Sequence, residues 1–359
     1  MLHKSYPLIA AALAGLMACR HSNAQPPDYG FQWATVTHPG NRAANQTEAP
    51  EFFPPFNTPA LNKGSVGYNY RIATTEVTTS HWLEFVQAYA PYHAGPRTLT
   101  AFTSWNIFPT SLDPDEPAGY VMRPGTENVA VTMSWYFAAR YVNWLENGKA
   151  PQREAFESGV YDAATFAQNP DGTWPQPGAR APGAQFWIPT VDEWVKAAFY
   201  DPNRYGEDQE GYWQRPNRGD ALLIPGLPQN GGQTLHGAPD ELRGDYPVGL
   251  FSNVLSPWGL LDVSGGVTEW LGDGAGWSNV VFTMGTRNFG LLDERSDRVD
   301  QLGATFATSA TGHGLRIASA IPSPSAGAFA IGAIVVLSSR RRRRLACDSS
   351  QRSRSLFSQ

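Results

Sequence analysis

The sequence predicts an irregular α+β fold in which a few helices and short strands are joined by long loops. The chain of 359 residues contains 35 glycines and 29 prolines, a composition that favours turns over long helices. Only three segments have the apolar spacing of a helix, and the segments with strand character are short and scattered. Because 42% of the residues are apolar, we still expect a protein with a real core.

Each predicted helix begins at a capping residue and presents one apolar face. Ser80 is the expected N-cap of the first helix and Ser134 that of the second. Thr190 and Glu193 have the spacing of a capping box, which predicts the start of the third. The helices are expected within residues 78–90, 134–149 and 189–202.

The remaining segments predict short strands and two long loops. The loops, residues 91–128 and 200–245, contain aromatic residues among glycine, proline and asparagine. Loops of this length in a folded domain often line a binding surface. No internal repeat and no long linker interrupts the chain, which predicts one domain over residues 25–320. Strands are expected within residues 66–77, 184–189, 280–286 and 314–319.

The two ends of the chain have the composition of targeting segments. Residues 1–24 contain Lys4, a short apolar run and small residues before Gln25, which is typical of a secretory signal peptide. Alternatives are a lipoprotein acylation site at Cys19 and a buried helix. Residues 321–344 end in five arginines and resemble the PEP-CTERM sorting signal of exported bacterial proteins, with Ser323 in place of the usual glutamate. A plain tail anchor is the alternative, and residues 345–359 form a basic tail.

Charge and cysteine content exclude several functions. The chain has a net charge of −5 although its last twenty residues contain seven arginines, so the segment between the ends is strongly acidic and unsuited to nucleic acid. The cysteines, Cys19 and Cys347, lie in the two end segments. The predicted domain therefore has no disulfide, no thiolate metal site and no cysteine nucleophile.

Six blocks of the sequence, in order, resemble the formylglycine-generating enzyme, or sulfatase-modifying factor, family. They read "YRIATTEVTTSHWLEF", "VAVTMSWYFAARYVNWLENG", "ESGVY", "FWIPTVDEWVKAAFYDP", "GLLDVSGGVTEW" and "HGLRIAS". The resemblance covers about residues 64–319. It implies a domain similar to the C-type lectin-like fold, with small antiparallel sheets, two principal helices and much coil.

The resemblance does not extend to the chemistry of that family. Its active members oxidise a cysteine of a sulfatase peptide with copper bound by two of their own cysteines, which lie between the last two blocks. Here the corresponding residues 284–316 contain no cysteine. Without soft thiolate ligands, no copper site and no oxidase activity are expected, and no catalytic residue is assigned.

The block "GLLDVSGGVTEW", residues 259–270, corresponds to a loop that holds a structural calcium ion in the family. The resemblance implies side-chain ligands at Asp262 and Glu269 and carbonyl ligands at Gly265 and Val267. Oxygen ligands of this kind suit Ca²⁺. Gly266 stands where the family usually has asparagine, and a polar turn without an ion is the alternative.

Two functions remain open. The first is an exported, surface-sorted binding or structural module for an extracellular peptide or glycan, whose tail is processed by a sorting protease at the membrane. The second is an enzyme with altered, metal-assisted chemistry on the same scaffold. In the family the surface that grips an extended peptide lies near the C-terminal blocks, although each residue there is equally consistent with a solvated loop. The candidate groove residues are Asp273, Trp277, Arg287, Asn288, Asp293, Glu294 and Arg295.

Overall fold

A computed structural model of the protein describes the greater part of the chain. One compact unit, Pro26–Ala320, contains nearly all of the described residues. Among them no helix is long and apolar enough to cross a membrane. The described residues are 25–49, 62–113, 115–117, 119–173, 179–242, 245–274, 280–284, 286–287, 302–309 and 312–321.

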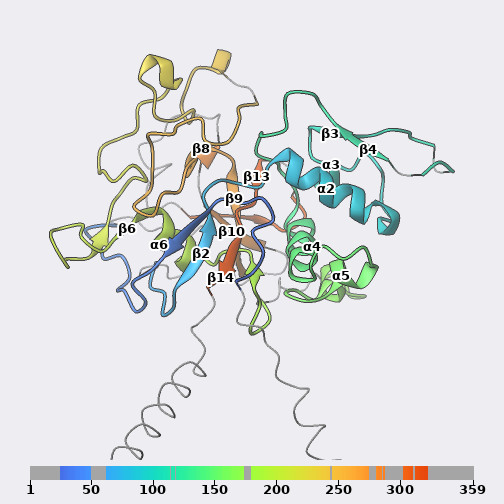
Figure 1. The fold of residues 1–359 in the computed structure, drawn as a ribbon, viewed down its shortest axis with the longest axis horizontal. Coiled ribbons are helices and arrows are strands. Elements are labelled where there is room, and N and C mark those ends of the chain that lie inside the picture. Colours follow the sequence, from blue (N-terminus) through green and yellow to red (C-terminus); the bar gives the residue numbers. More distant parts are fainter. Residues whose placement is uncertain are drawn as a thin grey trace, which may run out of the picture. The chain divides into compact units, whose positions relative to one another are not determined.

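Both ends of this unit lie in one four-stranded sheet with the order β1-β2-β14-β5 (Figure 1). All neighbouring strands are antiparallel. All four residues of β2 are buried, as expected for a strand with neighbours on both sides. The strands are β1 (Trp33–Val36), β2 (Tyr70–Ala73), β5 (Phe186–Trp187) and β14 (Ala318–Ala320).

A single buried arginine of β2 binds the beginning and the end of the unit. The Arg71 guanidinium donates through Nη2 to the carbonyl oxygen of Pro26 at 2.6 Å and through Nε to Oγ of Ser319 at 3.2 Å. Its Nη1 is paired with the carboxylate of Asp28. These bonds to charged and polar partners compensate the burial of the guanidinium.

The second sheet, β12-β10-β9-β13, contains the end of the block "GLLDVSGGVTEW". Strands β9 and β10 are antiparallel, with a register shift between Val281 and Thr283, and β13 pairs with β9 in parallel. The preceding residues of the block form β8, which pairs with β11. The strands are β8 (Ser264–Gly266), β9 (Thr268–Gly274), β10 (Val280–Met284), β11 (Thr286–Arg287), β12 (Gly303–Phe306) and β13 (His313–Gly314).

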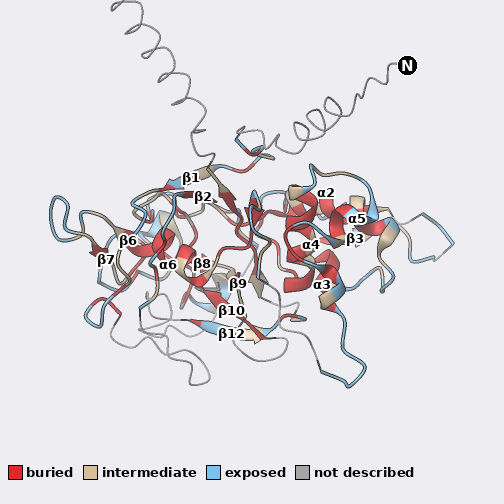
Figure 2. Ribbon diagram, turned by 90° about the horizontal axis from the view of Figure 1, so that it is seen from below, coloured by how far each residue is buried: buried red, intermediate tan, exposed pale blue. Residues whose placement is uncertain are grey.

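The helices flank these sheets. Figures 1 and 2 show α2, α4 and α5 together on one side of β9 and β10, with α6 on the other side. The α-helices are α2 (Thr79–Tyr89), α3 (Thr100–Thr103), α4 (Trp135–Glu146), α5 (Arg153–Glu157) and α6 (Val191–Phe199). Two hairpins, β3 (Ile107–Pro109) with β4 (Tyr120–Met122) and β6 (Tyr200–Asp201) with β7 (Gly211–Tyr212), lie in the long loops. Single 3₁₀ turns occupy Ala90–Tyr92, Ala163–Phe166, Pro228–Asn230 and Asp240–Leu242.

The helix starts agree with the sequence at two of three positions. Ser134 caps α4, and Thr190 with Glu193 forms the capping box of α6. The expectation for α2 is wrong by two residues, because Thr78 and not Ser80 is the N-cap. The backbone N–H of Thr78 donates to Nδ1 of His81, three residues later, at 3.5 Å, so a histidine supplies the reciprocal contact of the cap.

Four fully buried tryptophans of the core satisfy their indole N–H groups, whereas the buried Nε1 of Trp144 has no hydrogen-bond partner among the described residues. Four of the largest fully buried side chains are tryptophans, and Figure 2 shows the buried segments concentrated in the helices and central strands. The indole N–H of each of these four finds an acceptor across the core, as a buried polar group requires. The bonds run from Trp82 to the Phe102 carbonyl at 2.7 Å, from Trp135 to the Leu271 carbonyl at 3.0 Å, from Trp194 to the Glu269 carboxylate at 2.6 Å and from Trp270 to the Met133 carbonyl at 2.8 Å.

Removing the cap of α6 is expected to lower the free energy of unfolding by about 1 kcal/mol. The Thr190 hydroxyl accepts the N–H of Glu193 at 3.2 Å, and Thr190→Ala leaves that N–H without its acceptor. Urea denaturation followed by tryptophan fluorescence measures the loss. Thr190→Ser keeps the hydroxyl and is the control, so equal losses in both variants would show that the cap contributes nothing.

Candidate functional site

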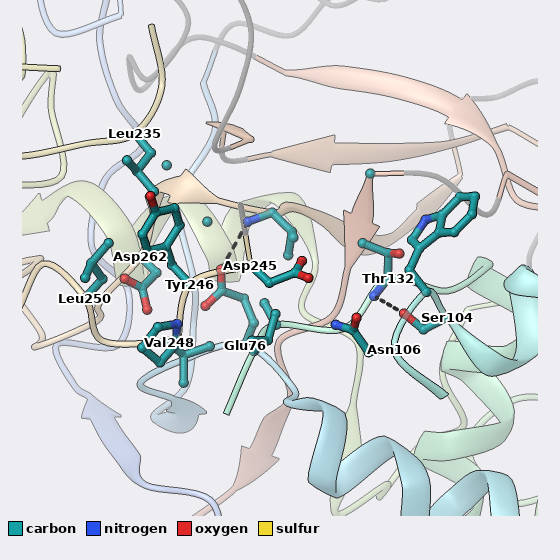
Figure 3. Close-up of a pocket in the computed structure, with 18 of the residues that line it drawn as sticks. Glu76, Ser104, Asn106, Thr132, Leu235, Asp245, Tyr246, Val248, Leu250 and Asp262 are labelled. Atoms are coloured by element: carbon teal, nitrogen blue, oxygen red, sulfur yellow. Dashed lines mark hydrogen bonds between the residues drawn. The ribbon is translucent and has the colours of Figure 1, made fainter. Parts of the chain in front are cut away.

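A cavity of about 310 Å³ lies where several distant segments of the chain meet (Figure 3). Among the described residues, its lining contains the acidic side chains Glu76, Asp245 and Asp262 and no lysine, arginine or histidine. Much of the remaining wall is apolar. That wall includes Val129, Leu235, Val248, Leu250 and Phe251.

Glu76 reaches the cavity from the turn between β2 and α2. The backbone of this turn is fixed because the Val77 N–H donates to the Leu315 carbonyl at 2.7 Å. The Glu76 side chain is fully buried, and its Oε1 accepts the Val267 N–H at 3.3 Å. Its other oxygen, Oε2, is buried and accepts no hydrogen bond from any described residue. A buried carboxylate oxygen without a hydrogen bond lowers the stability of the fold. We infer that this side chain has a role beyond packing.

The absence of a side chain at Gly266 makes room for Glu76. A Cβ atom at position 266 would lie 2.1 Å from Oε1 of Glu76 and 3.3 Å from Cβ of Asp262. Such contact is too close for any side chain, so the carboxylate of Glu76 can take this position only beside a glycine. The lack of a side chain at Gly266 thus helps to shape the cavity.

Asp262 lines the cavity from the loop before β8. Its backbone adopts a left-handed conformation with φ of 57°, which aspartate tolerates better than most residues. The side chain is 7% exposed, and its Oδ2 accepts the N–H of Gly249. Glu76 and Asp262 therefore flank Gly266 as two buried carboxylates.

Arg316 neutralises a third carboxylate next to this pair. Its fully buried guanidinium donates through Nη2 to Oε1 of Glu269 at 2.7 Å and through Nε to the same carboxylate at 3.0 Å and 3.1 Å. Carbonyl oxygens of Ala73 and Leu261 accept its other N–H groups. Oε2 of Glu76 is 3.8 Å from Nη2, which is outside hydrogen-bonding distance.

The surroundings raise the pKa of the two buried carboxyls of the cavity, Glu76 and Asp262. Burial is the main cause for Glu76, whose pKa lies well above its usual value; repulsion by Asp262 and Glu269 adds to the effect and Arg316 opposes it. Burial also raises the pKa of Asp262, while the Gly249 N–H and Arg316 oppose the shift. The protonated forms are favoured whenever no further cation is near.

The opposite wall carries polar atoms from the first long loop and the segment before α4. Oδ1 of Asn106 and Oγ1 of Thr132 are buried without a hydrogen-bond partner among the described residues. The Ser104 hydroxyl nearby accepts the N–H of Thr132 at 3.3 Å. Trp105 also lines the cavity and is 59% exposed, so an aromatic ring stands at the solvent side of a polar wall.

The residues expected to bind calcium lie in and around β8 and β9, but they do not all face the cavity. Asp262 lines the cavity, as do Gly265 and Val267, but the Glu269 carboxylate is held by Arg316 and Trp194. A calcium ion on Glu269 would have to share that carboxylate with a guanidinium. In the described part of the chain, no group of three or more His, Cys, Asp or Glu side chains is placed to hold a metal ion. Calcium binding by these four residues stays a prediction.

The expected groove residues are only partly within the described chain. Asp273 accepts the N–H of Val191 at the start of α6 and does not line the cavity. Arg287 belongs to β11. The others lie outside the described residues, as do the expected signal peptide, residues 1–24, and all but the first residue of the expected sorting segment, residues 321–344. Those other groove residues are Trp277, Asn288, Asp293, Glu294 and Arg295.

Sequence reasoning missed the residue at the centre of the cavity. Glu76 entered it only as part of a family block. Its only local signal is an acidic residue between an apolar strand and a capped helix, a position that does not by itself indicate burial. Asn106 and Thr132 gave no local signal at all.

These features define an irregular α+β domain, with few helices and short, mostly antiparallel sheets, that encloses a small acidic cavity. The chain belongs to the sulfatase-modifying factor family, since the sequence profile of the "sulfatase-modifying factor enzyme 1-like domain" matches residues 32–307. Comparison with curated proteins gives no match.

Solved structures resemble this chain at low sequence identity. The crystal structure of CarF is 18% identical, with a TM-score of 0.46 over 81% of this chain and 98% of that chain. The variable protein 1 of Treponema denticola is 15% identical, with a TM-score of 0.46 over 80% and 95% of the two chains. PvdO from Pseudomonas aeruginosa is 13% identical, with a TM-score of 0.43 over 82% and 97%.

Proposed function

We propose that this protein is an exported member of the sulfatase-modifying factor family that does not oxidise cysteine and acts by binding a peptide or a glycan in the cavity. The observation that carries the proposal is the cavity itself, a largely apolar pocket with buried polar atoms that make no hydrogen bond to any described residue. Binding sites for small ligands combine an apolar lining with a few directed polar groups in this way.

The lack of thiols supports the non-oxidising part of the proposal. Cys19 and Cys347 are the cysteines of the chain, and neither falls within residues 32–307, the segment that matches the family. A cuprous site needs soft sulfur ligands. Export rests on the composition of the two end segments, and a structural calcium ion at Asp262 remains part of the proposal.

No turnover is expected when the purified protein is incubated under air with copper and a cysteine-containing sulfatase peptide. Mass spectrometry of the peptide and an oxygen electrode measure product and oxygen use. The double variant Cys19→Ser, Cys347→Ser is the control for adventitious copper on the end segments. Formylglycine formation by that variant would overturn the non-oxidising part of the proposal.

A screen of peptide and glycan arrays tests the binding part. Val248→Phe adds a ring to the cavity wall and is expected to abolish the binding of a ligand that occupies the cavity. Leu222→Phe, at an exposed loop position, is the matched control and is expected to leave that binding unchanged. A ligand that both variants bind equally well would not occupy the cavity.

A second candidate function is an enzyme that uses the two cavity carboxyls as acid and base. The adjacent burial of Glu76 and Asp262, each with a raised pKa, favours it, since acid–base catalysis uses carboxyls tuned in this manner. A cavity ligand that is chemically changed by the wild type but returned intact by Glu76→Gln would favour this enzyme over the binding module.

A further inference from the structure

The wall of the cavity that carries Trp105 is built on a strained residue. Ser104 ends helix α3 with φ of 65° and ψ of −176°, a backbone conformation that is unfavourable for any residue but glycine. The residue is buried, and its hydroxyl accepts the N–H of Thr132 at 3.3 Å. Strain of this kind persists only where the surrounding structure imposes it, and it is common at ligand-binding sites.

Backbone hydrogen bonds on both sides hold Ser104 in this conformation. Its N–H donates to the Thr100 carbonyl of α3 at 2.9 Å. Two residues later, the Asn106 carbonyl accepts the N–H of Arg123 at 2.8 Å, which continues the pairing of β3 with β4. Residues 104–106 are therefore fixed at both ends, and the strained residue sets the directions of the two side chains that follow it.

Those two neighbouring side chains differ sharply in exposure although both line the cavity. Trp105 is 59% exposed and is the one exposed tryptophan among the described residues. Asn106 is 4% exposed, and its Oδ1 is buried without a hydrogen bond to any described residue. A buried amide oxygen without a donor lowers the stability of the fold unless a ligand satisfies it. The wall thus combines an open apolar ring with an enclosed acceptor.

Thr132 adds a second polar atom to this wall (Figure 3). Its backbone is fixed because the next residue, Met133, donates its N–H to the His313 carbonyl at 3.0 Å. Its Oγ1 is buried and makes no hydrogen bond to any described residue. A hydroxyl can both donate and accept, whereas an amide oxygen only accepts. A ligand that satisfies Asn106 and Thr132 together therefore has to bring donors, and groups that can also accept suit it best.

We propose that this wall binds a neutral glycan whose rings carry equatorial hydroxyls, as glucose does. The apolar face of one ring lies on Trp105, and hydroxyls of the glycan bond to Asn106 and Thr132. This inference rests on the proposed function and narrows its ligand from a peptide or a glycan to a glycan. It is compatible with a calcium ion at Asp262 and with the ion pairs of Arg316, because it uses neither.

A sugar supplies this combination of groups better than a peptide does. The axial C–H groups of a glucose-type ring form a flat apolar face, which matches the large flat surface of an indole. Each sugar hydroxyl both donates and accepts, whereas a peptide N–H only donates. Asn106 and Thr132 are uncharged, so the ligand needs no charge. The volume of about 310 Å³ lies at the lower end of the usual range for ligand sites, about 300–1,000 Å³, so a short stretch of a glycan fills it.

Matched ligands test the proposal with the full-length protein and excess calcium, by isothermal titration calorimetry. The probes are cellotetraose and its N-acetylglucosamine counterpart, which have both ring faces and hydroxyls. Sorbitol has the hydroxyls without a ring, and a glycine–serine tetrapeptide amide has N–H and O–H donors without a ring. We expect at least one of the two oligosaccharides to bind more tightly than sorbitol and the peptide, by about tenfold or more.

Matched variants locate the binding. Trp105→Ala is expected to weaken binding of that oligosaccharide about tenfold. Phe108→Ala removes a ring that is 48% exposed but does not line the cavity, and it is expected to leave the affinity unchanged. Thr132→Val is expected to weaken binding about fivefold. Because the Thr132 hydroxyl has no partner in the free protein, this variant is not expected to lower the free energy of unfolding in urea, whereas a purely structural hydroxyl would give the reverse pattern.

Several outcomes would overturn the proposal. No binding of either oligosaccharide, affinity no higher than that of sorbitol, or equal effects of Trp105→Ala and Phe108→Ala would each do so. So would sugar binding that is lost on chelation of calcium but kept in Trp105→Ala, since the sugar would then lie on the ion. If an array peptide is lost in Val248→Phe and no oligosaccharide binds, this inference fails while the proposed binding function stands. If no array ligand depends on the cavity, both fail.

Discussion

Replacing Arg316 with methionine is expected to lower the free energy of unfolding by about 3–5 kcal/mol, the usual effect of leaving a buried charge without its partner. The guanidinium is fully buried and makes three hydrogen bonds to the Glu269 carboxylate. Glu76 and Asp262 also lose the nearest positive charge. Urea denaturation at pH 7 measures the effect.

The same substitution at an exposed ion pair provides the control. Arg123 and Asp245 form a salt bridge in which both side chains are almost half exposed, so Arg123→Met is expected to cost less than about 1 kcal/mol. Glu269→Gln in the Arg316→Met background is expected to restore part of the stability, since it removes the buried charge. Equal losses of unfolding free energy for Arg316→Met and Arg123→Met would contradict the prediction that the buried ion pair of Arg316 stabilises the core more than an exposed one.

Glu76→Gln is expected to stabilise the protein at pH 8 in the absence of a ligand, because glutamine cannot carry the charge whose burial is unfavourable. The folded-state pKa of Glu76 is raised, mainly by burial and also by Asp262 and Glu269, against the opposing effect of Arg316. Its stabilising contribution is therefore complete below the usual glutamate pKa and is lost as the pH rises through the raised value. Glutamine stays neutral and can still accept the Val267 N–H.

Unfolding midpoints in urea between pH 4 and pH 8 test this prediction. The wild type and Glu76→Gln are expected to differ little near pH 4 and to diverge as the pH rises. Asp262, whose pKa is also raised, adds a pH dependence that remains in the variant. The exposed substitution Glu84→Gln provides the control. Curves that run parallel for the wild type and Glu76→Gln would show that the buried carboxyl carries no such penalty.

Local signals predicted the parts of the fold that are set by neighbours in sequence. The caps at Ser134 and at Thr190 with Glu193 involve residues three apart, and both are confirmed. Strand β9 was not predicted, because Gly272, Asp273 and Gly274 have low strand propensity and pairing with β10 and β13 forms the strand. The first strand, β1, was also missed, and only the two ends of residues 313–320 form strands, β13 and β14.

The cavity could not be predicted from the sequence for a similar reason. Glu76 and Gly266 meet only in the folded chain, and neither residue signals the other. The resemblance implies that Glu269 binds calcium, which stays a prediction, and the structure also places Arg316 beside this carboxylate. No spacing in the sequence indicates that Arg316 and Glu269 form a buried ion pair. The family, in contrast, could be identified, because its blocks keep their order along the chain.

The contacts of Arg71 bring the first and last residues of the folded unit within reach of one side chain. A short peptide can therefore join residue 320 to residue 26, and new chain ends can be opened in a long surface loop. Such a circular permutant would keep every strand of the sheet that contains Arg71. It would also remove both terminal segments from the folded unit in a single step.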